Sequence, residues 1–387
     1  MPAVNICAII ILKCAIRFQK TEVVLAPPYY CNNNIRNKTI TDPGKCITAN
    51  PLSPLQPYWC FLVSDLVNGK PATGMNNSLQ IGGLTVQPPG NINKNSYGLP
   101  GRLYKLRNKN GLEATITNCG AQLISLLVTN RHGNLVDVIA APGKSNGRHG
   151  VEGIPEVVVW DAKQLNDHIV ELNYPKKNVW GNLNAKVTYF LNDYNGLKII
   201  FEVNTDKGAV INPTDIVFFN LNGRNNGNIL NHQVWIKADN YLPVDQSMAI
   251  TGKMEAVANT PFDFRNSATI GSRINDHHVQ LKNGNGYNHD FILNKHVTRT
   301  PVARVMGNKS DIIMEVFTDQ PGLKFYSGNL VQNKINEAAL NEGPHAAFAM
   351  KTRHLFDLHT QPQFIPAQLG PGHTYRSVTS YLLKNKI

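Results

Sequence analysis

From residue 102 to residue 383 the chain consists of short apolar runs, each bounded by turn-forming residues. The runs are rich in Val, Ile, Phe and Tyr, which favour β-strands, and no segment sustains a helical stripe over several turns. Strands are expected at LEATIT, QLISLLV, LVDVIAA, EVVVW, KVTYFL, LKIIFEV, IVFFNL, HQVWIKA, DIIMEVF, LKFYSG and SVTSYLL. The pattern predicts an all-β domain, a large antiparallel β-sandwich of two sheets.

Two turn sequences support antiparallel hairpins within this domain. NDYNG (192–196) separates KVTYFL from LKIIFEV, and we expect Gly196 to supply the positive φ that such a turn needs. RHGN (131–134) has a similar role between QLISLLV and LVDVIAA.

Residues 1–100 have a different texture, rich in Pro, Asn and Gly, and are expected to form an irregular extension before a domain at 101–387. The apolar stretch at 6–12 is too short to span a bilayer, and no basic segment precedes it. A small disulfide framework and secretion are open possibilities. They rest on five clustered cysteines and three glycosylation sequons: Cys7, Cys14, Cys31, Cys46, Cys60, Asn37, Asn76 and Asn308.

The net charge of +12 raises the question of a nucleic-acid partner. The basic residues are spread singly, without a run of five like charges, and no zinc-finger spacing or RNA-binding aromatic motif accompanies them. We therefore expect no nucleic acid, no metal and no cofactor. The charge is compatible with an anionic ligand.

Several polar residues interrupt apolar runs and are candidates for a binding face. Asp263 lies between two phenylalanines in TPFDFR, His149 lies between glycines in GRHG, and Lys324 precedes an aromatic pair in PGLKFYSGN. Lys351 ends the apolar run of HAAFAMKTR. Converging side chains of this kind suit a sugar, whose hydroxyls bind carboxylates, imidazoles and amides. The simpler interpretation of each is a solvated strand end or a structural side chain.

Taken in order, these stretches resemble the aldose 1-epimerase, or galactose mutarotase, family. The matching blocks are YKLRNKNGLEATITNCGAQLISLLVTNRHGNLVDVI, NPTDIVFFNLNG, NTPFDFRNSATIGSRI, GYNHDFIL, TDQPGLKFYSGN and QPQFIPAQLGPGHTYRSVTSYLL. The resemblance implies a β-sandwich of the galactose mutarotase type with an open sugar-binding cleft. It also implies a cytoplasmic location, against which the cysteines and sequons keep secretion open.

The resemblance also shows where the catalytic groups of the family would stand. Mutarotation needs a base for the anomeric hydroxyl and an acid for the ring oxygen. The glutamate that serves the family as base corresponds to Lys351 in AMKTR, and the histidine that serves as acid corresponds to Ile216 in TDIVFFNL. Isoleucine cannot move a proton, and a lysine protonated at neutral pH is a poor base unless it is strongly desolvated. We expect both positions to be non-functional in catalysis.

Part of the family's binding equipment is kept. His149 and Asp263 match the family, whereas Lys324 stands where the family has glutamine, and an arginine-containing block before GRHG is missing. The resemblance thus implies substrate binding by His149, Asp263, Lys324 and Lys351.

Three functions remain open from the sequence. The first is a catalytically silent protein that binds a monosaccharide or an anionic sugar derivative. The second is an active epimerase with His149 as acid and Asp263 or Lys351 as base. The third is an interaction protein whose first hundred residues carry the function while the sandwich is a scaffold.

Overall fold

The central strand β10 (Gly196–Thr205) shows why these sequences form sheets. Its alternate residues Leu197, Ile199, Phe201 and Val203 are buried, and the residues between them face away from the core. Strands β9 (Leu183–Leu191) and β22 (Thr374–Asn385) pair with β10 on its two sides, both antiparallel. Every strand pairing within the described residues is antiparallel, so the predicted all-β antiparallel class is confirmed.

The structure is a computed structural model that describes residues 79–81, 84–86, 101–140, 158–174, 183–205, 209–210, 217–329, 343–355, 368–370 and 372–386. These residues all fall within one compact unit, Asn77–Ile387. The first five cysteines lie outside the described residues, so their pairing stays a prediction. Cys119, which lies among the described residues, is buried and not in a disulfide.

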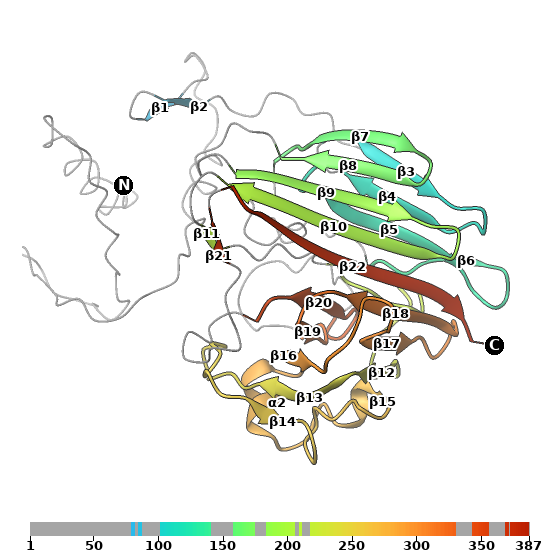
Figure 1. The fold of residues 1–387 in the computed structure, drawn as a ribbon. Coiled ribbons are helices and arrows are strands. Elements are labelled where there is room, and N and C mark those ends of the chain that lie inside the picture. The colour runs from blue at the N-terminus through green and yellow to red at the C-terminus, as the bar shows by residue number, and fades with distance from the viewer. Residues whose placement is uncertain are drawn as a thin grey trace, which may run out of the picture. The chain divides into compact units, whose positions relative to one another are not determined.

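A nine-stranded sheet is the largest layer (Figure 1), with the order β15-β12-β17-β18-β22-β10-β9-β8-β7. Besides β9, β10 and β22, its members are β7 (Asp161–Asn166), β8 (Ile169–Asn173), β12 (Gln233–Ile236), β15 (Ala268–Thr269), β17 (Ala303–Met306) and β18 (Ile312–Thr318).

Two smaller sheets complete the sandwich (Figure 1). A four-stranded sheet has the order β3-β4-β5-β6, formed by β3 (Leu103–Arg107), β4 (Glu113–Thr117), β5 (Gln122–Thr129) and β6 (Leu135–Asp137). A five-stranded sheet has the order β14-β13-β16-β19-β20, formed by β13 (Ala238–Leu242), β14 (Glu255–Ala256), β16 (Asn288–Leu293), β19 (Gly322–Tyr326) and β20 (Ala349–Arg353).

The remaining described elements are short. They are the pairs β1 (Leu79–Ile81) with β2 (Leu84–Val86) and β11 (Ala209–Val210) with β21 (Gln368–Leu369), the 3-10 turn η1 (Ile270–Ser272) and the helix α2 (Val279–Gly284). No helix in the described part of the chain is long and apolar enough to cross a membrane.

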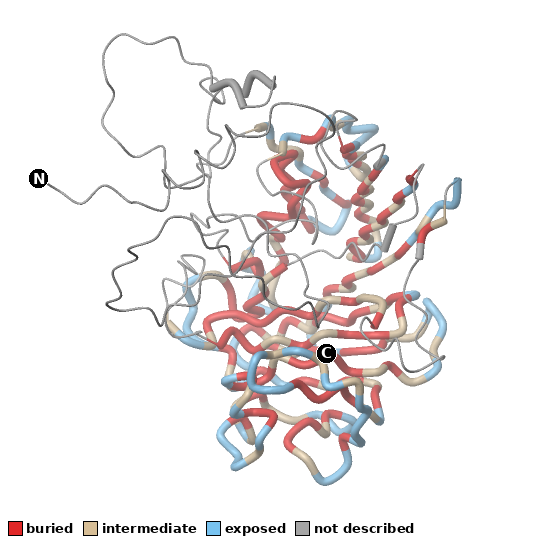
Figure 2. Tube along the Cα trace, turned by 90° about the vertical axis from the view of Figure 1, so that its left-hand side faces the viewer, coloured by how far each residue is buried: buried red, intermediate tan, exposed pale blue. Residues whose placement is uncertain are grey.

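One continuous hydrophobic core joins the three large sheets. It contains Ile116 of β4, Tyr189 of β9 and Phe291 of β16, all essentially inaccessible to solvent. Figure 2 shows the buried residues along the interior strands and the exposed ones mainly in connecting loops. The five-stranded sheet faces this core with one side only, and its Met350 backbone oxygen accepts a hydrogen bond from the Tyr381 hydroxyl of β22 at 3.4 Å.

Some local predictions differ from the structure. The described end of EVVVW forms only an isolated bridge, Cys119 to Val159. In the described part of IVFFNL, residues 217–221, only Phe219 forms β-bridges, one to Ile139 and one to Phe348. The β7–β8 hairpin was not predicted, because β7 is an edge strand with mostly exposed side chains and carries no apolar alternation.

The prediction for the NDYNG turn also needs correction. In NDYNG the positive φ of 61° belongs to Asn195, and Gly196 instead leaves room for the Asn192 side chain, which would lie 2.9 Å from a β-carbon there. Within residues 1–100 the structure describes β1 and β2, which pair with each other antiparallel, and the expectation that this part of the chain is irregular stays a prediction. The prediction that a separate domain begins at residue 101 remains a prediction.

Candidate functional site

The outer face of the five-stranded sheet carries the polar residues, because its strands alternate strictly. Along β19 and β20 the burial pattern is the same, with Lys324 and Lys351 each partly exposed between buried neighbours. Phe325 and Met350 point the opposite way, into the core. Lys351 is therefore not a frayed strand end, since it lies in the middle of β20.

Three strands place their charged residues in one row. Asp290 of β16 is paired with Lys324 of β19, and Lys324 is paired with Lys351 of β20. Side chains of residues directly opposite on antiparallel strands lie on the same face, with β-carbons about 5 Å apart. The structure thus brings Lys324 and Lys351 together and adds a carboxylate beside them. We call Asp290, Lys324, Lys351 and Arg353, which lies two residues beyond Lys351 on the same face, the charged row.

Two ion pairs converge on Asp290, whose side chain is only 4 % exposed. The Lys324 Nζ lies 4.0 Å from Oδ2, and the Arg353 Nε lies 3.7 Å from Oδ1. Both distances exceed those of a direct hydrogen bond. In the described part of the chain Oδ1 accepts no hydrogen bond, although it is buried. A buried carboxylate oxygen in this state is costly, and a hydroxyl group from a ligand would satisfy it.

The neighbouring row on the same face supplies an amide and an aromatic ring. Asn288 is paired with Tyr326, and Tyr326 with Ala349. The Tyr326 hydroxyl donates to the backbone oxygen of Asn329, and its ring meets that of Phe218 edge to face, with centroids 6.1 Å apart. The face therefore combines charged groups, an amide and an aromatic side chain, which is the mixture that sugar sites use.

The segment after β19 is held in one conformation by Asn329. Its amide donates to the backbone oxygens of Gly284 (2.9 Å) and Tyr287 (3.0 Å), and its oxygen accepts from the Ser327 hydroxyl (2.6 Å). Gly328 between them has a φ of 67°, and a β-carbon there would lie 2.2 Å from the Ala347 oxygen. The SGN sequence thus anchors the end of β19 to the backbone at Gly284 and Tyr287, and Gly328 lies close to the backbone of Ala347.

His289 is the inward-facing neighbour of Asp290 and belongs to the core. Its ring is fully buried, contacts Phe262 with centroids 4.7 Å apart, and its Nε2 lies 3.1 Å from the Gln280 Oε1. Burial, reinforced by the nearby Lys324 charge, lowers the pKa of His289 to about 3. A histidine in this position is a neutral packing group with no route to a ligand.

Asp263, predicted to bind substrate, has its described contacts elsewhere. Phe262 and Phe264 on its two sides are buried, and its carboxylate receives Nε (2.9 Å) and Nη2 (2.8 Å) of Arg265. The hydrogen bonds from Arg265 hold the pKa of Asp263 below its usual value, outweighing its burial. Within the described residues no contact joins Asp263 to the charged row, and its role in binding stays a prediction.

His149 and Ile216 lie outside the described residues, so neither prediction is tested. Two residues of the charged row were not predicted as site residues, namely Asp290 and Arg353. The sequence contained a signal for both, because side chains alternate between the two faces of a strand. In NHDF, Asp290 points to the face opposite to that of His289, and in MKTR, Arg353 points to the same face as Lys351.

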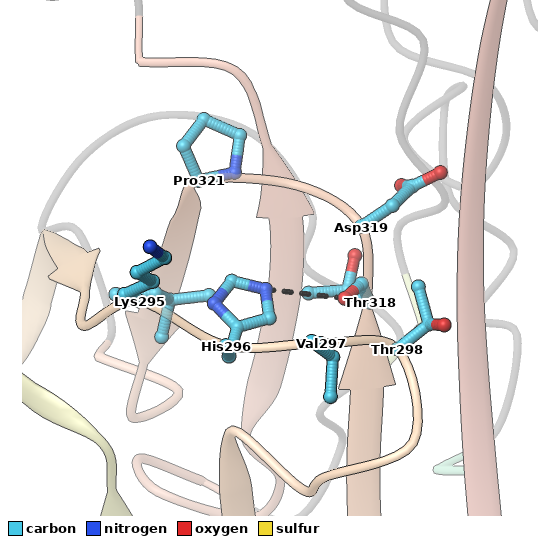
Figure 3. A pocket seen from close by; sticks show the side chains of 8 residues that line it. Lys295, His296, Val297, Thr298, Thr318, Asp319 and Pro321 are labelled. Atoms are coloured by element: carbon cyan, nitrogen blue, oxygen red, sulfur yellow. Dashed lines mark hydrogen bonds between the residues drawn. The ribbon is translucent and has the colours of Figure 1, made fainter.

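A cavity of about 520 Å³ lies near the ends of β16 and β18, away from the charged row (Figure 3). It is lined by Leu293, Lys295, His296, Val297, Thr298, Thr318, Asp319 and Pro321. Its histidine is already engaged, because Nδ1 lies 2.9 Å from the Asn294 oxygen and Nε2 lies 3.1 Å from the Thr318 oxygen. None of the predicted site residues lines this cavity.

Among the described residues, no group of three His, Cys, Asp or Glu side chains is placed to hold a metal ion.

Comparison with known proteins identifies the family. Residues 142–382 match the family model described as aldose 1-epimerase. The galactose mutarotases of Mus musculus and Homo sapiens are 36% and 32% identical over 245 and 253 residues, spanning 60% and 62% of this chain and 68% and 70% of theirs. The aldose 1-epimerase of Escherichia coli K12 is 28% identical over 339 residues, covering 73% of this chain and 95% of its own. The chain belongs to the aldose 1-epimerase family.

Solved structures agree on the fold. An aldose epimerase homologue from C. elegans superposes with a TM-score of 0.62 at 19% identity, covering 74% of this chain and all of the other. A galactose 1-epimerase from Lactobacillus acidophilus superposes with a TM-score of 0.61 at 24% identity, covering 74% and 95%. The predicted β-sandwich of the galactose mutarotase type is confirmed.

Proposed function

We propose that this protein binds sugars on the outer face of its five-stranded sheet and does not catalyse their mutarotation. The observation that carries the proposal is the direct pairing of Lys351 with Lys324 on that face. By the family resemblance, Lys351 occupies the position of the base. A lysine therefore stands in the middle of β20, on the outer face of the five-stranded sheet, where the family has a glutamate.

The chemistry of ring opening explains why this substitution matters. A base must take the proton from the anomeric hydroxyl, and each such positioned group contributes roughly 10² to 10⁴ in rate. An ammonium group has no lone pair to receive a proton. Ile216, at the position of the acid, cannot supply one either.

Other described residues do not replace the missing base. Asp263 is engaged by Arg265, and its lowered pKa makes it a weaker proton acceptor. His289 is buried beneath the sheet. Asp290 does reach the outer face, but its carboxylate is already paired with the cations Lys324 and Arg353.

Binding equipment persists on the same face. The Oδ1 of Asp290, which accepts no hydrogen bond in the described part of the chain, is an acceptor for a sugar hydroxyl. The Asn288 amide offers both a donor and an acceptor. Tyr326 supplies an aromatic surface near them. These groups bind hydroxyls without transferring a proton, which is what a silent member of the family requires.

The second candidate is an active aldose 1-epimerase. It is favoured by the relatives, which carry the names galactose mutarotase and aldose 1-epimerase, and by the presence of one carboxylate, Asp290, on the face. His149 would be the acid in that case.

Titration calorimetry with galactose tests the binding half of the proposal. We expect saturable binding to the wild type and a loss of about tenfold in affinity for Asp290→Asn, because a hydrogen bond to a charged acceptor is worth about 1.5 kcal/mol or more. Asp193→Asn is the matched control, since this partly exposed aspartate pairs with Lys109 and lies in the turn between β9 and β10 of the nine-stranded sheet. An absence of saturable sugar binding, or an unchanged affinity in Asp290→Asn, contradicts the proposal.

A further inference from the structure

We infer that Asn329 is a positioning residue of the sugar-binding face, because its buried amide fixes the two strand ends that carry Asn288 and Tyr326. The inference rests on the proposed sugar binding at this face and assigns the residue that holds its amide and its aromatic ring in place. Asn288 and Tyr326 are direct partners, at the point where β16 begins and β19 ends. Their orientation therefore depends on how the chain is held just outside this pair.

The beginning of β16 is held through the peptide group between Tyr287 and Asn288. Its oxygen accepts hydrogen bonds from the Asn329 amide (3.0 Å) and from the Ser327 backbone N–H (3.0 Å). Its N–H donates to the Nδ1 of His289 at 3.2 Å. That ring is neutral near pH 7 and able to accept the bond, because burial lowers the pKa of His289 to about 3. The backbone that carries Asn288 is thus held at both its oxygen and its nitrogen.

The end of β19 is held through Tyr326 and Ser327. The Tyr326 hydroxyl donates to the backbone oxygen of Asn329, and its ring meets that of Phe218 edge to face, with centroids 6.1 Å apart. The Ser327 hydroxyl donates to the Asn329 Oδ1 at 2.6 Å and accepts from the Tyr287 N–H at 3.1 Å. An aromatic side chain that is already ordered costs a ligand little conformational entropy on binding.

The Asn329 amide matches its surroundings in both chemistry and size. The side chain is 1% exposed, and its Nδ2 donates to the Gly284 oxygen (2.9 Å) as well as to the Tyr287 oxygen. An apolar side chain or a carboxylate at this position would deprive both buried oxygens of a donor. Gly286 makes room for the amide, since a β-carbon there would lie 2.5 Å from the Asn329 Oδ1.

Asn108 is a matched residue in another part of the fold. It is also buried, and its amide donates to the Asn192 backbone oxygen (2.9 Å) and the Asn195 Oδ1 (2.8 Å). Its Oδ1 accepts from the Leu112 N–H at 2.9 Å. These bonds join the β3–β4 turn to the β9–β10 turn. Losing either Asn108 or Asn329 removes comparable hydrogen bonds, but only those of Asn329 hold the strands of the sugar-binding face.

Titration calorimetry with galactose on two alanine variants tests the inference. We expect Asn329→Ala to weaken galactose binding about tenfold, because the ligand must then order Asn288 and Tyr326, and Asn108→Ala to change the affinity less than about threefold. Urea unfolding should show that both variants are less stable than the wild type. Loss of stability is then common to the two variants, whereas loss of affinity belongs to Asn329→Ala.

Gly286→Ala is a second variant, which keeps Asn329 itself and decides the question if Asn329→Ala does not fold. Its β-carbon displaces the amide, and we expect galactose affinity to fall by at least about threefold. Gly111→Ala is its control, because Gly111 also has a positive φ, of 81° against 122° at Gly286. A β-carbon at Gly111 meets no described atom within 4 Å, so the affinity should be unchanged.

The outcomes separate this inference from the proposed function. Unchanged galactose affinity in Asn329→Ala and Gly286→Ala, or an equal loss in Asn108→Ala, would overturn the positioning role and leave the proposed sugar binding standing. An absence of saturable galactose binding to the wild type would overturn the proposed function and this inference together.

Discussion

At the scale of single residues, two neighbours on β16 point to opposite faces of the sheet. His289 faces the core, whereas Asp290 faces outward to Lys324 and Arg353. The alternation of a strand is sufficient to produce this division. A histidine followed by an aspartate in the sequence therefore does not indicate a catalytic pair here, because the two side chains lie on opposite faces of the sheet.

The burial of His289 makes folding stability depend on pH. The pKa of His289 and that of the buried His232 are both lowered to about 3, chiefly by burial, against about 6.5 in an unfolded chain. Between these values the unfolded state binds more protons, so stability is full above pH 6.5 and falls as the pH decreases. Each histidine contributes a slope of about 1.4 kcal/mol per pH unit in this window.

Urea unfolding at pH 6 and pH 5 measures this slope. We expect His289→Gln to lose about 1 kcal/mol less stability than the wild type over that pH step, whatever its absolute stability, because the protonation of His289 on unfolding is removed. His132→Gln, at an exposed turn, should keep the slope of the wild type. An unchanged slope in His289→Gln would show that His289 is not neutral and buried as described.

At the scale of elements, the junction between β19 and β20 depends on Gly328. Gly328 and Gly111 both have a positive φ, of 67° and 81°. A β-carbon at Gly328 would lie 2.2 Å from the Ala347 oxygen, whereas a β-carbon at Gly111 meets nothing within 4 Å. The two positions share the cost of a left-handed conformation and differ in the steric clash.

Alanine at these two glycines separates the contributions. We expect Gly111→Ala to lower the free energy of unfolding by about 1 kcal/mol, and Gly328→Ala to lower it by at least about 2 kcal/mol more, because backbone atoms must move. Chemical denaturation measured by circular dichroism checks both values. Equal losses in the free energy of unfolding would contradict this expectation, because they would show that the backbone near Gly328 accommodates a β-carbon without strain.

Elements also show where prediction from sequence succeeds and fails. The long strands β5, β9, β10 and β22 were predicted because they contain apolar runs rich in Val, Ile, Phe and Tyr and because turns bound them. The β7–β8 hairpin was missed because exposed polar residues of an edge strand carry no such pattern. The turn glycine at 196 was misassigned because asparagine also adopts a positive φ, and Asn195 takes it.

At the scale of the whole molecule, the sequence predicts the fold better than the site. The antiparallel sandwich follows from many strands that each point to the same architecture. The charged row, in contrast, depends on the register between β16, β19 and β20, which are separated along the chain. Lys324 and Lys351 were predicted separately, but nothing in the sequence showed that they are direct partners or that Asp290 completes the row.

Polarimetry of freshly dissolved α-D-galactose, with purified protein at micromolar concentration, tests the central claim most directly. The account predicts that the wild type does not exceed the spontaneous rate, because neither Lys351 nor Ile216 transfers a proton. Lys351→Glu combined with Ile216→His, the pair of residues the family resemblance places there, runs beside it to show whether the site can regain activity. Acceleration by the wild type would contradict the account and assign the acid and base to other residues, with His149 and Asp290 the first to replace.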